Sequence, residues 1–245
     1  TVSNMIIEGI YYIFIIITDR RVIIMNIFDI LGPVMVGPSS SHTAGATKIG
    51  LTARKLLAEK PIKADIYLHG SFAATGVGHG TDKALIAGIL GMQADDMRIP
   101  HSFDVAKEEG LTFSIQNKNL KEAHPNTALI EIEGEQGRTL KIQASSLGGG
   151  RIMVNKIDDI DVNFSGEYNT LIIHNVDQPG HVAEVTSLLA HKGVNVANMH
   201  LYRDRRGGYA CMVIEIDQQM PQSGLDWLKR VEGIIKVTYF NREVE

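Results

Sequence analysis

Alternating apolar and polar positions in the middle of the chain predict strands over residues 111–116, 128–133 and 138–144. Residues 64–69 also read as a strand, and the Gly-Glu-Gln-Gly segment 134–137 predicts a hairpin turn. Apolar residues recur at helical spacing over 44–58, and a second helix is expected over 83–90. The chain up to residue 157 should therefore mix helices with a half-exposed antiparallel sheet.

The last third of the chain predicts a different arrangement. Strands and helices are expected in the order βαββαβ, which is the ferredoxin-like arrangement, at 169–176, 181–191, 194–202, 209–217, 224–231 and 234–240. A segment rich in aspartate precedes them and predicts a linker. The expected fold class is α+β, with a mixed α/β domain at 25–157, a linker at 158–167 and a ferredoxin-like domain at 168–245.

The first 24 residues do not fit either domain. Residues 6–17 are almost wholly apolar, but Glu8 and Gly9 interrupt them, and they fall short of the ~20 residues that span a bilayer. No basic residue precedes the apolar run and no cleavage site follows it, so we do not expect a membrane anchor. Met25 is expected to be the functional start, and 1–24 an N-terminal extension, either upstream sequence or an extra β-rich arm.

Composition narrows the function classes. The chain has 245 residues, 44% of them hydrophobic and 21% charged, which is typical of a globular protein large enough for two domains. A net charge of -4 without a long basic run argues against nucleic acid as a partner. The single cysteine, Cys211, excludes an internal disulfide and a cysteine-rich metal site made by this chain alone, so no metal ligand is predicted here. A reducing cytoplasm fits best.

A hydroxyl-rich loop is the first candidate site. Residues 37–43, Gly-Pro-Ser-Ser-Ser-His-Thr, precede a helix that should begin near 41–43. The unpaired N–H groups of a helix start attract a carboxylate or phosphate, and His42 could transfer a proton there. The alternative is that these hydroxyls only cap the helix.

Other polar segments lie at the ends of predicted elements. The glycine-rich segment 70–82 does not match a dinucleotide or P-loop pattern, because the third glycine of 76–81 comes one position early and no GK[ST] follows. We interpret it as a loop that approaches a small ligand, with His79 and Asp82 as polar contacts, or as a helix–strand packing site. Residues 124–127 contain a proline that excludes a regular helix, and 145–150 expose glycine amides suited to an anion.

Together these motifs closely resemble the β subunit of iron–sulfur-dependent bacterial L-serine dehydratase, from about Met25 to the C-terminus. The matching strings are 28–33 (Phe-Asp-Ile-Leu-Gly-Pro), 37–43, 70–71, 75–76, 78–79, 81–82, 124–127 (His-Pro-Asn-Thr) and 146–150 (Ser-Leu-Gly-Gly-Gly). The resemblance implies deamination of L-serine to pyruvate and ammonia, without pyridoxal phosphate. It further implies a [4Fe-4S] cluster held by a separate alpha subunit, and residues 44–46, Ala-Gly-Ala, look like the two-chain branch. Residues 1–24 have no counterpart.

The same resemblance implies site residues. Elimination of water from serine needs a base and a Lewis acid on one substrate, and this chain can supply imidazoles, hydroxyls and amides. The implied catalytic residues are His42, Thr43 and His124. The implied substrate-binding residues are Ser39, Ser40, Ser41, Gly78, His79, Asn126, Thr127, Ser146, Gly148 and Gly149. Which histidine is the base stays open among His42, His79 and His124.

The ferredoxin-like domain is similar to an ACT domain, a module that commonly binds amino acids at a paired interface. The similarity implies a homodimer through this domain and an effector site for L-serine or a similar amino acid at Asn175, Asp177, Gly180, His181, Asn195 and Asn198. A purely structural dimerisation role is the alternative. For the whole chain, the alternatives are an amino-acid sensor that binds serine without turnover, and a partner that only stabilises the alpha subunit.

Overall fold

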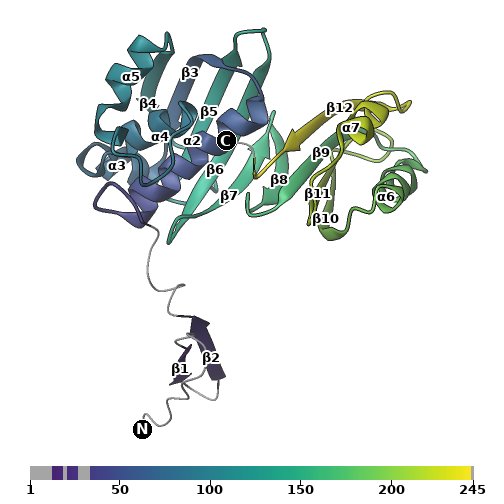
Figure 1. The fold of residues 1–245 in the computed structure, drawn as a ribbon, viewed down its shortest axis with the longest axis horizontal. Helices are drawn as coiled ribbons and strands as arrows, with labels where there is room; N and C mark the ends of the chain where they lie inside the picture. The colour runs from purple at the N-terminus through teal and green to yellow at the C-terminus, as the bar shows by residue number, and fades with distance from the viewer. Residues whose placement is uncertain (1–12, 19–20, 27–33, 244–245) are drawn as a thin grey trace.

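In a computed structural model of the chain, residues 13–18, 21–26 and 34–243 are described (Figure 1). β1 (Ile13–Thr18) and β2 (Arg21–Asn26) pair antiparallel, and β2 runs across the expected start at Met25. The rest of the expected extension and the 28–33 motif lie outside the described residues. No helix in the described part of the chain combines the length and the apolar character that crossing a membrane requires.

A six-stranded sheet forms the body of the first domain. Its strand order is β4-β3-β5-β6-β7-β8, and every neighbouring pair is antiparallel except β3 and β4. The predicted strands are confirmed, but the expected antiparallel sheet is wrong for β4, which joins the edge of β3 in parallel after a helical crossover. The strands are β3 (Pro61–Leu68), β4 (Thr112–Asn117), β5 (Thr127–Gly134), β6 (Thr139–Gly148), β7 (Arg151–Ile157) and β8 (Ile160–Phe164).

The predicted first helix is confirmed and is held tightly. A short π-helical turn, η1 (Ser40–Ala44), leads into α2 (Gly45–Leu57), which packs across β5, β6 and β7. α4 (Thr81–Ile89) packs against α2 through glycines: a Cβ on Gly88 would lie 2.0 Å from the Thr47 carbonyl oxygen. Two further helical segments, η2 (Ile99–His101) and α5 (Ser102–Glu108), follow α4.

The predicted glycine-rich loop over 70–82 is wrong. Residues Gly70–His79 form a helix, α3, and α4 begins at Thr81. The N–H of Ser71 donates to the carbonyl of Pro125 at 2.7 Å, and the Phe72 side chain is fully buried. Contacts from a distant segment therefore stabilise a helix that its glycines alone disfavour.

The second sheet confirms the ferredoxin-like prediction. Its order is β10-β11-β9-β12, with all neighbours antiparallel and two helices completing the βαββαβ sequence. The elements are β9 (Asn169–Val176), α6 (His181–His191), β10 (Val196–Arg203), β11 (Tyr209–Ile216), α7 (Gln222–Leu228) and β12 (Ile234–Phe240).

The two sheets share buried surface. Residues 158–167 were expected to be a linker, but β8 lies within this segment, belongs to the first sheet and contacts β10 and β11 of the second (Figure 1). Four buried residues of the second sheet join the core of the first domain: Ile172, Cys211, Val213 and Phe240. An ion pair between Asp158 and Lys236 also crosses this boundary. The two domains therefore meet through an apolar face rather than through a flexible tether.

Candidate active site

His42 is the centre of a hydroxyl cluster at the start of α2. Its side chain is buried, with 9% of the residue exposed, and hydroxyls reach both ring nitrogens. Nε2 lies 3.1 Å from the hydroxyl oxygens of both Ser71 and Thr75 on α3. Nδ1 lies 3.3 Å from the Ser41 hydroxyl and 3.4 Å from that of Ser39. The ring is thus fixed by two elements, the η1 turn and α3.

The hydrogen-bond pattern assigns the tautomer of this ring. The Thr75 hydroxyl lies 2.9 Å from the Ser71 carbonyl oxygen, which can only accept, so the hydroxyl proton points there. The Thr75 oxygen then accepts from an Nε2–H of His42, which leaves the lone pair of the neutral ring on Nδ1.

The surroundings of His42 keep its ring neutral. Burial lowers the pKa of His42 because it disfavours the imidazolium, and the neighbouring His79 lowers this pKa further. A hydrogen bond that the His42 ring donates to the Ser71 backbone opposes both effects. The two imidazole rings lie 4.9 Å apart, and Phe72 packs edge-on against His42 at 5.3 Å. A neutral imidazole near pH 7 can accept a proton.

His79 and Thr43 complete the inner part of the cluster. His79 Nδ1 donates to the Thr75 carbonyl at 3.1 Å, so its Nε2 is the unprotonated nitrogen of the neutral ring. The Thr43 hydroxyl donates to the His79 carbonyl at 3.3 Å, and Thr43 is buried. The Ser39 hydroxyl accepts the His42 backbone N–H at 3.2 Å. The structure therefore shows the serine loop capping the helix, as in the alternative interpretation, while it also holds the imidazole.

Four segments far apart in sequence meet at this cluster. The Gly149 N–H donates to the Ser40 hydroxyl at 3.3 Å, which ties the β6–β7 turn to η1. The Ser146 N–H donates to the Asn126 carbonyl at 2.8 Å, which ties it to the segment before β5. The Ser146 hydroxyl is fully buried and has no hydrogen-bond partner in the described part of the chain, and a Cβ on Gly45 would lie 2.0 Å from it. The loops predicted from sequence are thus brought together, with α2 closely packed behind them.

Other predicted residues lie at the edge of this cluster. His124 is exposed, and its Nδ1 accepts the Asn126 N–H at 3.1 Å within the same loop. Thr127 is buried, donates to the His124 carbonyl at 2.6 Å and contacts the Ser145 hydroxyl at 2.8 Å. Gly78 is exposed on α3, and Asp82 accepts the N–H of its neighbour Lys83. Gly148 and Gly149 have positive φ angles of 87° and 62° in the β6–β7 turn.

Ser71 and Thr75 were missed as site residues. The motif strings contained both residues, but a loop over 70–82 gave no reason to place their side chains on one face. Ser71, Thr75 and His79 recur every four residues, which places them on one face of a helix. This spacing was the signal that could have identified them.

The predicted effector residues form two separate groups within one chain. Asn175 pairs through β11 with Arg203, whereas Asn198 pairs through β11 with Thr170, so the two asparagines are offset by five residues or about 17 Å. Asp177 is held by the Gly207 N–H at 3.0 Å and by Arg203 at 3.3 Å, and the Gly207 bond lowers the pKa of its carboxyl. Asn195 donates to Asp217 at 2.6 Å, at the same end as Asn198.

Two buried polar atoms near the start of α6 have no hydrogen-bond partner among the residues that the structure describes. They are the side-chain oxygen of Asn175 and Nε2 of His181. Gly180 precedes the helix with a φ of 109°, and His181 Nδ1 lies 3.4 Å from a carboxylate oxygen of Glu184. This end of the sheet holds Asn175, Asp177, Gly180 and His181 together, apart from Asn195 and Asn198.

The residues of this chain do not fit an iron–sulfur cluster. Cys211 is the one cysteine in the sequence, lies buried in β11, and burial raises the pKa of its thiol to about 12. A cluster requires several thiolates, which this chain cannot supply. Within the described residues, no group of three or more histidine, cysteine or acidic side chains is arranged to hold a metal ion.

Comparison with known proteins adds family information to this geometry. Residues 26–157 match the family described as serine dehydratase beta chain, and 169–233 match the ACT domain. The chain is 39% identical over 213 residues to the "Probable L-serine dehydratase, beta chain" of Bacillus subtilis, covering 87% of this chain and 96% of that protein. It is also 39% identical over 213 residues to the "L-serine dehydratase, beta chain" of Peptoniphilus asaccharolyticus, covering 86% of this chain and 96% of that protein. A "D-3-phosphoglycerate dehydrogenase" of Archaeoglobus fulgidus is 25% identical over 197 residues, 79% of this chain but 37% of that protein.

Proposed function

Because the chain belongs to the serine dehydratase beta chain family, we propose that it forms one wall of an active site whose [4Fe-4S] cluster is held by a separate alpha subunit. The chain is the beta chain of an L-serine dehydratase, part of an L-serine ammonia-lyase. The single cysteine supports the proposal that the cluster comes from the partner, and a reducing cytoplasm suits it.

The buried ring of His42, with hydroxyl groups at both of its nitrogens, is the observation that carries the proposed role. Conversion of serine to pyruvate and ammonia begins with removal of a weakly acidic α-proton and loss of the hydroxyl group. When bound, the cluster supplies Lewis acidity toward that hydroxyl group. His42 supplies the complementary group, a base whose Nδ1 carries the lone pair.

The remaining residues of the cluster are proposed to bind and orient L-serine. The hydroxyls of Ser39, Ser40 and Ser41 and of Thr43 provide hydrogen bonds for the substrate carboxylate near a helix start. His79, Asn126, Thr127 and Ser146 supply further polar contacts. Gly78, Gly148 and Gly149 leave room for the ligand, since a Cβ at each would meet nothing within 4 Å. Exposed His124 is proposed to act from the rim, in contact with substrate or with the alpha subunit.

Co-expression with the alpha chain tests this function directly. We expect the pair, assembled anaerobically with iron, to form pyruvate from L-serine, and each chain alone to be inactive. An assembled, cluster-loaded complex that forms no pyruvate would contradict the proposal. A beta chain without turnover that nevertheless binds L-serine would instead favour a sensing role.

The sensing alternative has its own supporting observation. The similarity to a phosphoglycerate dehydrogenase covers 79% of this chain, so a comparable segment accompanies a different enzyme there. Two results together would support sensing: the chain binds L-serine, and replacement of His42 leaves turnover of the assembled pair unaffected. Loss of assembly with normal turnover per assembled complex would support a purely structural partner.

The ACT domain is proposed to form a homodimer that binds L-serine or a similar amino acid. The offset between Asn175 and Asn198 means that one chain cannot bring both to one ligand. Edge strand β10, which carries Asn198, pairs on one side only among the described strands, so a second copy can approach it there. A site completed by two chains would unite the two groups of residues and satisfy Asn175 and His181.

A further inference from the structure

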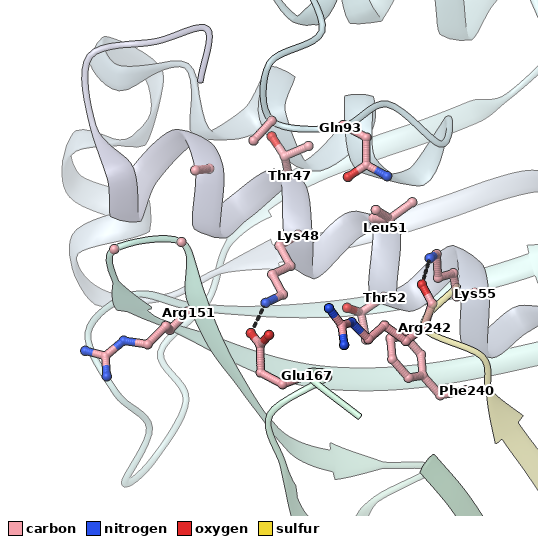
Figure 2. A pocket seen from close by; sticks show the side chains of 15 residues that line it. Thr47, Lys48, Leu51, Thr52, Lys55, Gln93, Arg151, Glu167, Phe240 and Arg242 are labelled. Carbon is pink, nitrogen blue, oxygen red and sulfur yellow. Dashed lines mark hydrogen bonds and ion pairs between the residues drawn. The ribbon is translucent and has the colours of Figure 1, made fainter. Parts of the chain in front are cut away.

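A pocket of about 440 Å³ lies between the two domains, next to the candidate active site. Its walls come from one face of α2, from the β6–β7 turn, from the connection before β9 and from the chain just after β12 (Figure 2). Ala44 and Gly149 line the pocket. Ala44 follows Thr43 in the chain, and the Gly149 N–H donates to the Ser40 hydroxyl.

The charge of this pocket is strongly positive. Its lining holds four basic side chains, Lys48, Lys55, Arg151 and Arg242, against one acidic side chain, Glu167. The whole chain carries a net charge of -4, so this local excess of cations is opposite in sign to the molecule as a whole. A cleft lined by one sign of charge concentrates ions of the other sign.

Among the described residues, the contacts leave two of these cations, Arg151 and Arg242, without a partner for the guanidinium group. Lys48 forms an ion pair with Glu167, and the Lys55 ammonium donates to the Arg242 carbonyl at 2.7 Å. Within the described residues, the guanidinium of Arg242 has no hydrogen bond or ion pair. Figure 2 shows it pointing from the chain after β12 into the space where Lys48 and Glu167 meet, whereas Arg151 points away from them. An arginine in this position is suited to a carboxylate or phosphate, which its planar group binds through two bonds.

Part of the pocket wall is packed against buried side chains. Gly166 lies where three elements meet, and a Cβ on it would be 3.8 Å from side chains of Ile152, Phe240 and Thr52. Thr52 and Phe240 are buried, and the Phe240 ring packs at a tilt against that of Phe164, with 6.3 Å between ring centres. Polar groups fixed on a rigid apolar base at a domain boundary are typical of small-molecule sites.

We propose that this pocket binds a compact dianion, either a phosphate monoester or a dicarboxylate, that pairs with Arg242 and replaces Glu167 as the partner of Lys48. The Glu167 carboxylate lies where the carboxylate or phosphate of the ligand would bind. Glu167 therefore competes with the ligand for Lys48. An occupant touches both domains and also the residues beside the hydroxyl-rich loop. The dianion therefore stabilises this arrangement of the domains by mass action.

Titration calorimetry on the full chain, with inorganic phosphate and separately with succinate at constant ionic strength, tests the proposal. We expect one site per chain, binding at least about tenfold weaker in Arg242→Gln and in Lys48→Gln, and tighter binding in Glu167→Gln. Arg230→Gln removes the same charge at an exposed position outside the pocket and should leave binding unchanged. Heat from phosphate alone identifies a phosphate site, and heat from succinate alone identifies a dicarboxylate site.

Three outcomes would overturn the proposal. They are the absence of binding by either anion, equal weakening by Arg230→Gln and Arg242→Gln, and weaker binding in Glu167→Gln. The thermal midpoint of unfolding should also rise with the bound anion in the parent and not in Arg242→Gln. The proposal goes beyond serine deamination, and the titration requires no alpha subunit, so its failure leaves the proposed function untouched.

Discussion

The acid–base state of His42 depends on particular neighbours rather than on the hydroxyl-rich loop alone. The loop was evident in the sequence, but the burial that lowers the His42 pKa and the approach of His79 come from α3, which lies about 30 residues later and was expected to be a loop. A local pattern can therefore predict which residue types gather at a helix start. It cannot predict the partners that tertiary packing brings to the second ring nitrogen.

His79→Gln is expected to move the acid limb of the pH profile of kcat/KM to higher pH. The electrostatic effect of His79 disfavours the imidazolium of His42, so removal of His79 raises the His42 pKa. Protonation then inactivates the base at a higher pH. The reconstituted complex should be assayed across the pH range on which it is stable. Complete loss of turnover at every pH would identify His79 as the base instead.

Thr75→Val is expected to lower kcat by up to about tenfold. The substitution removes the hydroxyl oxygen that accepts from Nε2–H of His42, so this tautomer of the ring is no longer held. Thr75→Ser keeps the hydroxyl and is the matched control, which should retain near-parent turnover. Equal activity in Thr75→Val and the parent would show that this contact does not position the ring.

At the scale of elements, local sequence patterns predicted the helices and strands that capping residues and polar–apolar alternation define. They failed where contacts with distant segments determine the secondary structure. The strands and helices of the ferredoxin-like domain were predicted within a few residues, because turns such as Asp177 to Gly180 delimit them. α3 was missed because Gly70, Gly76 and Gly78 indicated a loop. Its first turn is capped by the carbonyl of Pro125, 54 residues after the donating Ser71, and no local pattern contains this contact.

Glycines on different helices should respond in opposite ways to alanine. In Gly88→Ala, the new Cβ would lie 2.0 Å from a backbone oxygen of α2, so we expect a loss of about 1–3 kcal/mol in unfolding free energy. Gly78→Ala, on exposed α3 with nothing within 4 Å, should gain about 0.5–1 kcal/mol. Urea unfolding of both variants measures the difference, and equal stabilities would contradict the close packing of α2 on α4.

At the scale of the whole molecule, the two domains pack against each other through buried side chains. The segment expected to be a linker contains a strand, and Ile172, Val213 and Phe240 pack into the first core. The aspartates of this segment predicted a linker because aspartate is common in turns, and Asp158 and Asp159 do form the turn between β7 and β8. An isolated 168–245 fragment would expose these apolar residues. Effector binding should therefore be measured on the full chain.

Calorimetry on the full chain should show binding of L-serine or a similar amino acid to a dimer. Asn175→Ala and Asn198→Ala should each abolish it, although the register places them about 17 Å apart in one chain. Mixing the two variants should restore part of the binding, because a mixed dimer contains one intact site. Retained binding in both variants, or binding by a monomer in sedimentation analysis, would leave this domain only a structural role.

Pyruvate formation per cluster-loaded complex, compared between the parent and His42→Ala, tests the central claim most directly. A general base typically contributes ~10²–10⁴-fold, so turnover should fall by at least about two orders of magnitude while the alpha and beta chains still assemble. Turnover within a few-fold of the parent in a fully assembled His42→Ala complex would contradict the assignment of His42 as the group that takes the proton.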